Sequence, residues 1–210
     1  MKLRDCWLFL FAALAAMGAG APARAFGLAT GAGAVPVAAA QEVASPQAGG
    51  GSVIYLVRHA ETAGDRAMDP SNPPLSEAGA ARAVALAHAL ADAGLTSIHS
   101  TDLQRTRETA APVAAATGLE VALYDPSDQS AIRALLGRLA SDGGRHLIVG
   151  HSNTTPALVR MLGGDPVSPI AESEYDRLYV VSIAASGEVL STLLRYGTPE
   201  TRGRASGGSP

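Results

Sequence analysis

Short apolar runs alternate with longer amphipathic stretches between Ser52 and Gly197, and this alternation indicates a layered α/β domain. The first run, Val53–Val57, is uniformly apolar, which is typical of a strand buried on both faces. Ser76 then stands as a helix N-cap before alanines and leucines that recur at helical spacing until Gly94. The pattern predicts a three-layer sandwich in which helices flank a mostly parallel central sheet.

The rest of this region continues the alternation and closes with a hairpin. Apolar runs at Leu178–Ala184 and Val189–Leu194 are joined through a turn at Gly187, as in antiparallel pairs. Pro156 suits the first turn of a helix, where its missing N–H leaves no hydrogen bond unmade. The other predicted elements are, in chain order, the strand Ser97–His99, the helix Asp102–Ala116, the strand Glu120–Tyr124, the helix Asp128–Ala140, the strand His146–Val149 and the helix Ala157–Leu162.

Residues 1–25 have the pattern of an export signal. A cationic start precedes the apolar run Cys6–Met17, and the small residues Ala23 and Ala25 frame a cleavage site before Phe26. The apolar run is shorter than the roughly 20 residues that cross a bilayer as a helix. We therefore expect a signal peptide, an exported protein that is periplasmic or secreted, and no stable membrane insertion after cleavage.

Composition defines the remaining domain boundaries and excludes several classes of partner. Residues 26–51 are rich in Ala, Gly and Pro and predict a flexible linker, residues 198–210 predict a disordered tail, and 52–197 form the folded domain. The formal net charge of −3, which becomes more negative after signal removal, disfavours nucleic acid as a partner. Cys6 is the only cysteine, so the processed chain has neither a disulfide nor a thiolate zinc site.

Polar residues with a common chemistry follow three of the predicted strands. They occupy the segments Arg58–Thr62, Ser100–Ala110 and Gly150–Thr154. Ligands of open α/β sheets bind beyond the carboxyl ends of the strands, so these segments are expected to form one site.

In order and in context the three segments resemble the histidine phosphatase superfamily, which includes cofactor-dependent phosphoglycerate mutases and many small phosphatases. Arg58 and His59 stand at the Arg-His-Gly signature of that family, with Ala60 in place of the glycine. Arg105 fits its Ser-x-Leu-x-Arg-x-x-x-Thr-Ala helix start, and His151 follows a glycine as the second histidine does. The resemblance covers about residues 53–194 and implies the phosphoglycerate mutase-like fold.

The resemblance implies a role for each of these four residues. His59 would attack a phosphomonoester and carry the phosphoryl group, Arg58 and Arg105 would bind the phosphate, and His151 would donate to the transferring oxygens. The residue types suit this chemistry, because a phosphate with a charge of about −1.5 to −2 needs cations and planar donors. The two guanidinium charges also favour a neutral, nucleophilic imidazole at His59.

The proton donor is an open question at this level. Many members of the family carry a carboxylate in the loop after the second arginine; we favour Asp128 over Asp125, followed by Glu61 or substrate-assisted protonation. Asp125 also suits a turn, and Asp128 a helix cap. Thr62 and Asn153 lie where relatives place phosphate-facing groups, and capping of the following turn is an equally good interpretation of each.

The predicted function is that of an exported phosphomonoester hydrolase. Family mutases carry a longer insertion between the second arginine and the second histidine, whereas Arg105 and His151 are only 46 positions apart here. A non-catalytic phospholigand-binding protein and a phosphoglycerate mutase are the competing hypotheses. The expected partner is a small phosphorylated substrate or a phosphoprotein, and the sequence makes no prediction of oligomeric state.

Other chemistries fit less well. Gly150–Thr154 resembles a serine-hydrolase elbow, but no histidine follows Ser152 to complete a triad. His59 and Glu61 offer only two metal ligands, so neither a metal nor a cofactor is expected. Outside the motifs, His88, His99 and His146 are expected to be structural and Arg107 a solvated charge.

Overall fold

A computed structural model of the chain describes residues 50–64 and 67–197. The predictions of a signal peptide, of a tail and of nearly all of the linker lie outside these residues. Strands and helices follow one another in the order β1 (Ser52–Arg58), α1 (Glu77–Ala89), β2 (Ser97–Thr101), α2 (Gln104–Thr117), β3 (Val121–Tyr124), α3 (Gln129–Ser141), β4 (Gly144–Gly150), α4 (Thr154–Met161), β5 (Arg177–Ile183) and β6 (Val189–Arg195).

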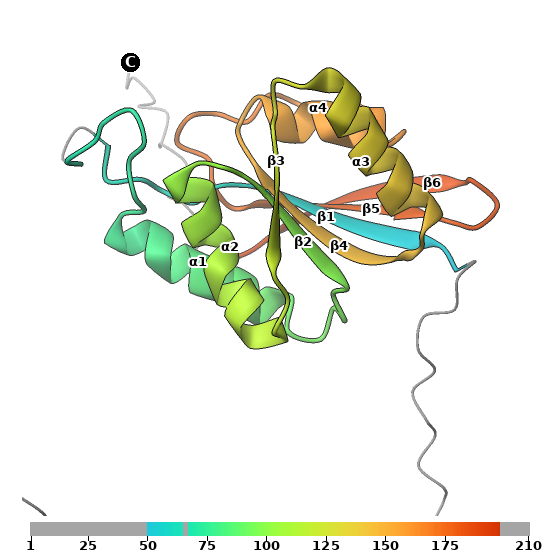
Figure 1. Ribbon diagram of the computed structural model, residues 1–210, viewed down its shortest axis with the longest axis horizontal. Coiled ribbons are helices and arrows are strands. Elements are labelled where there is room, and N and C mark those ends of the chain that lie inside the picture. Colours follow the sequence, from blue (N-terminus) through green and yellow to red (C-terminus); the bar gives the residue numbers. More distant parts are fainter. Residues whose placement is uncertain (1–49, 65–66, 198–210) are drawn as a thin grey trace, which may run out of the picture. The chain divides into compact units, whose positions relative to one another are not determined.

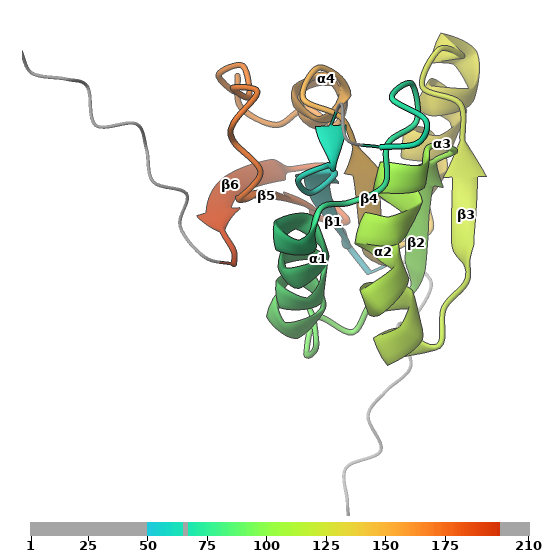
Figure 2. The ribbon, with the colours of Figure 1, turned by 90° about the vertical axis from the view of Figure 1, so that its left-hand side faces the viewer.

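The strands form one six-stranded sheet in the order β3-β2-β4-β1-β5-β6. The strands from β3 to β1 in this order are parallel, while β5 runs antiparallel to β1 and β6 antiparallel to β5. Figure 2 shows β3 and β6 at the two edges. The prediction of a mostly parallel sheet with a closing hairpin is confirmed.

Helices cover both faces of the sheet, with α1 and α2 on one face and α3 and α4 on the other (Figure 1). Successive side chains of β1 point to opposite faces, so Ile54 and Leu56 pack in the cluster under α3 and α4, and Val57 packs under α1 and α2. All three side chains are fully buried. The three-layer sandwich is therefore confirmed, with one apolar core on each side of the sheet.

The loop after β1 is fastened to the start of α1. Ser76 caps the helix by accepting a hydrogen bond from the Gly79 N–H at 3.1 Å, and its own N–H donates to the Glu61 carbonyl at 2.9 Å. A Cβ on Gly79 would lie 2.0 Å from that carbonyl oxygen, so only glycine permits the approach. This contact fixes the path of the chain just after His59.

Most element boundaries differ from the prediction by one to three residues, and those of α1 and β4 have a clear cause. Helix α1 ends at Ala89, because the residues before Gly94 form a turn in which the Ala93 N–H donates to the Leu90 carbonyl at 3.0 Å. Strand β4 begins two residues early, since its pairing with β1 already starts at Gly144. Within the described ranges, no helix is long and apolar enough to cross a membrane.

Candidate active site

The carboxyl ends of β1, β2 and β4 bring the three polar segments together around one cavity of about 680 Å³. Five of the seven residues that the sequence suggested line it, whereas Asp128 and Thr62 do not. The lining residues are Arg58, His59, Leu103, Arg105, Pro126, Ser127, His151, Ser152, Asn153, Thr154 and Glu172.

His59 is held as a neutral ring with a defined tautomer. Its backbone N–H donates to the Gly150 carbonyl at 2.9 Å, which ties the end of β1 to the end of β4. Its Nδ1 lies 2.8 Å from the Ala60 carbonyl oxygen, and because a carbonyl only accepts, Nδ1 carries the proton and Nε2 the lone pair. Burial lowers the pKa of His59 to about 3; the hydrogen bond to Ala60 opposes this shift, and the charges of Arg58 and Arg105 add to it.

His151 uses the opposite nitrogen. The ring centroids of His59 and His151 are 5.4 Å apart, and His151 Nε2 lies 2.9 Å from Thr101 Oγ1. The Thr106 hydroxyl donates to the carbonyls of Thr101 and Leu103, so it accepts from Thr101, and Thr101 in turn accepts from His151 Nε2–H. Burial lowers the pKa of His151 to about 4, and Nδ1 is the nitrogen left for a ligand.

Arg58 is buried beneath a segment that the sequence motifs did not include. Its Nη1 donates to the backbone carbonyls of Ala171, Glu172 and Glu174, and its Nη2 pairs with the Glu172 carboxylate at 2.9 Å. The ring of Tyr175 lies 4.1 Å from its guanidinium carbon, within cation–π range. The connection between α4 and β5 therefore forms one wall of the site.

Arg105 presents its charge to the cavity from the first turn of α2. Within residues 50–64 and 67–197, its guanidinium has neither a hydrogen bond nor an ion pair. Burial, and then the like charge of Arg58, lowers its pKa. A bound anion would relieve both effects, so this unpaired cation favours an anionic ligand.

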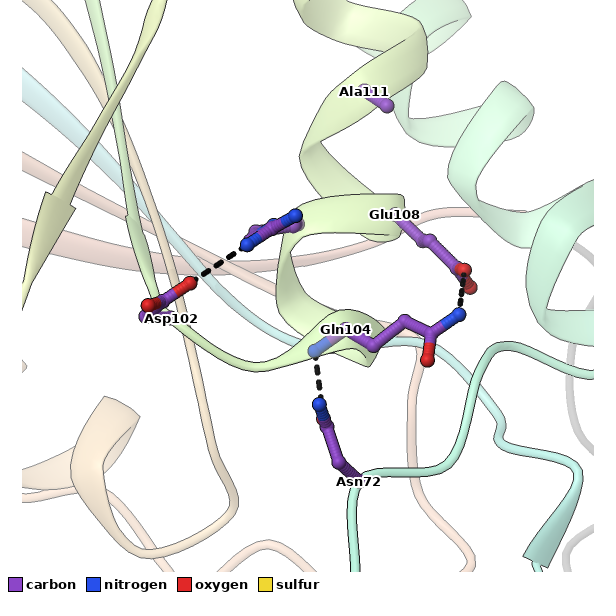
Figure 3. Close-up of a pocket in the computed structure, with 6 residues that line it drawn as sticks. Asn72, Asp102, Gln104, Glu108 and Ala111 are labelled. Atoms are coloured by element: carbon purple, nitrogen blue, oxygen red, sulfur yellow. Dashed lines mark hydrogen bonds and ion pairs between the residues drawn. The ribbon is translucent and has the colours of Figure 1, made fainter. Parts of the chain in front are cut away.

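Arg107, two residues further along α2, lines a second cavity of about 460 Å³. Figure 3 shows Asp102, Gln104 and Glu108 at this cavity. It is exposed and pairs with Asp102 at 2.8 Å, as expected for a solvated charge. The Asn72 side chain accepts from the Gln104 backbone N–H at 2.8 Å, and the Gln104 side chain donates to Glu108 at 2.8 Å. The polar side chains of this second cavity thus form hydrogen bonds and an ion pair with one another, whereas the Arg105 guanidinium in the first cavity forms neither within the described residues.

The favoured proton donor does not lie in the site. Asp128 is the N-cap of α3, where its Oδ1 accepts from the Ser130 and Ala131 N–H groups, both at 2.9 Å. The hydrogen bond from the Ser130 hydroxyl is the largest of the causes that lower the pKa of Asp128. Asp125 forms a similar turn with Ser127, whose hydroxyl bond lowers the pKa of Asp125. Both carboxylates are engaged in local turn and cap contacts and neither lines the cavity, which disfavours proton donation to a bound substrate.

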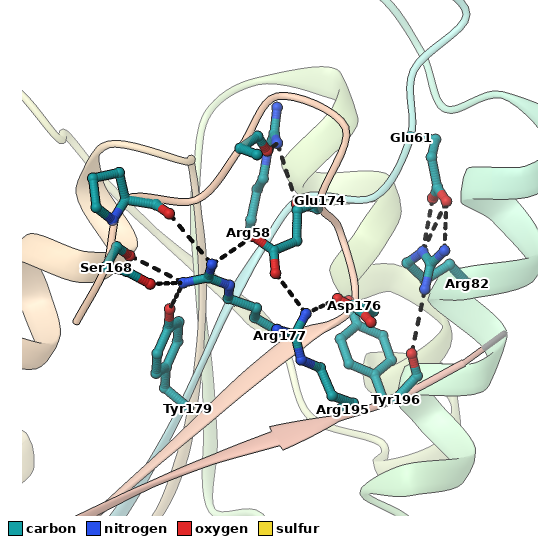
Figure 4. A network of polar contacts seen from close by, with 12 residues as sticks. Arg58, Glu61, Arg82, Ser168, Glu174, Asp176, Arg177, Tyr179, Arg195 and Tyr196 are labelled. Carbon is teal, nitrogen blue, oxygen red and sulfur yellow. Dashed lines mark hydrogen bonds and ion pairs between the residues drawn. The ribbon is translucent and has the colours of Figure 1, made fainter. Parts of the chain in front are cut away.

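Glu61 and Thr62 also point away from the cavity. The Glu61 carboxylate forms a bidentate ion pair with the buried Arg82, whose Nη2 lies 2.7 Å from Oε1 (Figure 4). Thr62 forms an isolated bridge with Leu75. These residues attach the loop after β1 to α1 and thereby position His59.

Asn153 stands at the N-cap of α4 and lines the cavity, but its side chain makes no capping hydrogen bond. The N-terminus of α4, with Ser152 and Thr154 beside it, therefore faces the cavity, where backbone N–H groups favour anions. In the part of the chain that the structure describes, no group of three His, Cys, Asp or Glu side chains is placed to hold a metal ion.

Comparison with known proteins agrees with this arrangement. Residues 54–126 match the family model of the histidine phosphatase superfamily, branch 1. Over these residues the chain is similar to the histidine phosphatase superfamily. The matched residues contain Arg58, His59 and Arg105, while His151 lies beyond them.

Individual relatives carry different names. The probable phosphoglycerate mutase GpmB of Yersinia pestis (strain Pestoides F) is 44% identical over 76 residues, which are 35% of this chain and 35% of the relative. The chain thus spans about a third of the length of this relative. A mycobacterial glucosyl-3-phosphoglycerate phosphatase in complex with VO3 superposes with a TM-score of 0.53 at 18% identity, covering 70% of this chain and 100% of that one. The protein histidine phosphatase SixA in complex with tungstate gives 0.52 at 19% identity, with 70% and 97% covered. These two likenesses concern the fold.

Proposed function

We propose that the chain is a phosphomonoester hydrolase that passes the phosphoryl group through His59. The observation that carries the proposal is the bond from His59 Nδ1–H to the Ala60 carbonyl, which leaves the lone pair on Nε2. The His59 ring is neutral and lines the cavity. Arg105, whose guanidinium is unpaired among the described residues, lines the same cavity. A nucleophile and a phosphate-binding cation thus meet in one place.

The reaction has two steps. In the first, Nε2 of His59 attacks phosphorus, the N–P bond forms and the bond from phosphorus to the leaving oxygen breaks. In the second, a water oxygen attacks phosphorus, the N–P bond breaks and inorganic phosphate is released. Arg58 and Arg105 are positioned to stabilise charge on the phosphoryl oxygens in both steps. A bound phosphate favours a proton on Nδ1 of His151, because a nearby anion favours imidazolium, and His151 then donates to the same oxygens.

Hydrolysis is favoured over transfer to a second substrate by the short connections of this region. Between Arg105 and His151 the chain forms α2, β3, α3 and β4, with connections of only two to four residues. No inserted segment between these elements closes over the cavity, so water reaches the phosphoryl group. A mutase is the second candidate, because the Yersinia relative carries that name.

The test is a quenched reaction with a labelled phosphomonoester. We expect an acid-labile, base-stable phosphate on the peptide that holds His59, and hydrolysis of p-nitrophenyl phosphate that persists in EDTA. His59→Ala should abolish both hydrolysis and label. His151→Ala should slow both steps by about 10²–10³-fold, the typical loss for one removed electrostatic donor.

A matched pair of arginine variants provides the control. Arg105→Ala should weaken activity strongly, whereas Arg107→Ala, which removes an exposed charge from the same helix, should change it little. Label on His151, or undiminished turnover by His59→Ala, would show that the nucleophile is misassigned. Interconversion of phosphoglycerates with little release of phosphate would favour the mutase, and binding of phosphate without turnover would favour a non-catalytic protein.

Export is a separate part of the proposal. It is supported by the cationic start, the apolar run and the small residues before Phe26. N-terminal sequencing of secreted material should find Phe26 or a close neighbour as the first residue.

A further inference from the structure

One carboxylate from outside the three sequence motifs faces the cavity. Among the described residues that line it, Glu172 is the only acidic one. The side chain is 85% exposed; Oε2 pairs with Arg58 Nη2 at 2.9 Å and Oε1 accepts from the Ser152 hydroxyl at 3.3 Å. The carboxylate therefore lies between a phosphate-binding arginine and the N-terminus of α4.

The backbone around Glu172 is held by Arg58, although the Glu172 side chain is largely exposed. Arg58 Nη1 holds the carbonyls of Ala171, Glu172 and Glu174 at 2.9, 3.0 and 3.2 Å. The Glu174 carboxylate is bound by Arg177 and Arg195, both at 2.6 Å (Figure 4), and the Arg177 hydrogen bond is the main cause that lowers the pKa of Glu174 to about 2. Of the two glutamates in this segment, one anchors it and the other is exposed at the cavity.

We propose that Glu172 supplies the proton that the leaving oxygen takes up and then removes a proton from the attacking water. The proposal rests on the function proposed above. In the first step, the proton moves from the Glu172 carboxyl to the leaving oxygen as the P–O bond breaks. In the second, the Glu172 carboxylate accepts a proton from water as the new O–P bond forms, which restores the starting state.

Phosphate binding itself prepares Glu172 for the first step. The carboxylate now uses the charge of Arg58, and an arriving phosphate dianion competes for the same guanidinium. The carboxylate is thereby released from Arg58 beside the bound phosphate.

The experiment compares leaving groups. Glu172→Gln keeps the size of the side chain and a hydrogen-bond acceptor for Arg58, but it cannot carry the proton. We expect kcat/KM for glycerol phosphate, whose alkoxide leaves poorly, to fall by about 10²–10⁴-fold, the usual contribution of a general acid. The loss for p-nitrophenyl phosphate should stay within about tenfold, because its anion leaves without a proton. Slow hydrolysis of the phosphoenzyme should also produce a burst of nitrophenolate.

Two further variants distinguish this role from a positioning role. Ser173→Ala, in the same exposed stretch, should affect both substrates little. Asp128→Asn tests the donor that the sequence favoured, and a loss that grows with leaving-group basicity in this variant would overturn the proposal. Equal losses for both substrates in Glu172→Gln, or no loss, would also overturn the proposed role of Glu172. Label on His59 in the same experiments would still support the phosphohistidine route. Absence of that label from the unaltered protein would overturn both.

Discussion

His59 and His151 face one cavity through opposite ring nitrogens. His59 commits Nδ1 to the carbonyl of Ala60, whereas His151 commits Nε2 to the hydroxyl of Thr101. The nitrogen left for a ligand is Nε2 in the first ring and Nδ1 in the second. The two histidines therefore present different ring nitrogens to the cavity, because the Ala60 carbonyl binds one ring and the Thr101 hydroxyl binds the other.

This difference can be measured by ¹⁵N NMR of the imidazole rings. We expect the Nδ1–H tautomer for His59 and the Nε2–H tautomer for His151, with His59→Gln and His151→Gln used for assignment. Because burial lowers the two pKa values to about 3 and about 4, neither ring should become an imidazolium between pH 7 and pH 5. Midpoints near 6.5, or the same tautomer for both rings, would contradict the deduced hydrogen bonding.

At the scale of elements, the features that could be predicted from the sequence are those that local residue patterns determine. The Ser76 cap, the order of strands and helices and the residues that directly follow β1, β2 and β4 all depend on near neighbours along the chain. Glu172 and Tyr175 were missed because their position depends on Arg58, more than a hundred residues away in sequence. The only sequence signal was a polar stretch between α4 and β5, which by itself indicates no more than a loop.

The joint between the loop after β1 and α1 gives an element-scale prediction. Gly79→Ala would place a Cβ 2.0 Å from the Glu61 carbonyl, so we expect a loss of about 1–3 kcal/mol in the free energy of unfolding, as for other overpacked sites. Gly137→Ala in α3 is the matched control, because nothing lies within 4 Å of its added Cβ. There the gain in helix propensity should stabilise by about 0.5–1 kcal/mol. Urea denaturation of both variants checks the pair, and equal effects would refute the close approach.

At the scale of the whole molecule, lowered histidine pKa values occur away from the cavity as well as in it. His99 on β2 and His146 on β4 both contact the Ser97 hydroxyl, at 2.8 and 2.9 Å. Burial, followed by the charges of His146 and Arg138, lowers the pKa of His99 to about 4. The buried faces of the sheet thus disfavour imidazolium in the folded chain at several places.

These histidines predict that the fold loses stability as the pH falls from about 6.5 towards 4. In that window the unfolded chain binds protons at His59, His99 and His151, whereas the folded chain does not, so the free energy of unfolding rises with pH. Carboxylates with lowered pKa values, such as Glu174, act mainly below this window. Urea denaturation at pH 7 and pH 5 should therefore show lower stability at pH 5, and His99→Gln should reduce the difference without touching the cavity. Equal stability of the unaltered chain at the two pH values would mean that these rings already accept protons in the folded state.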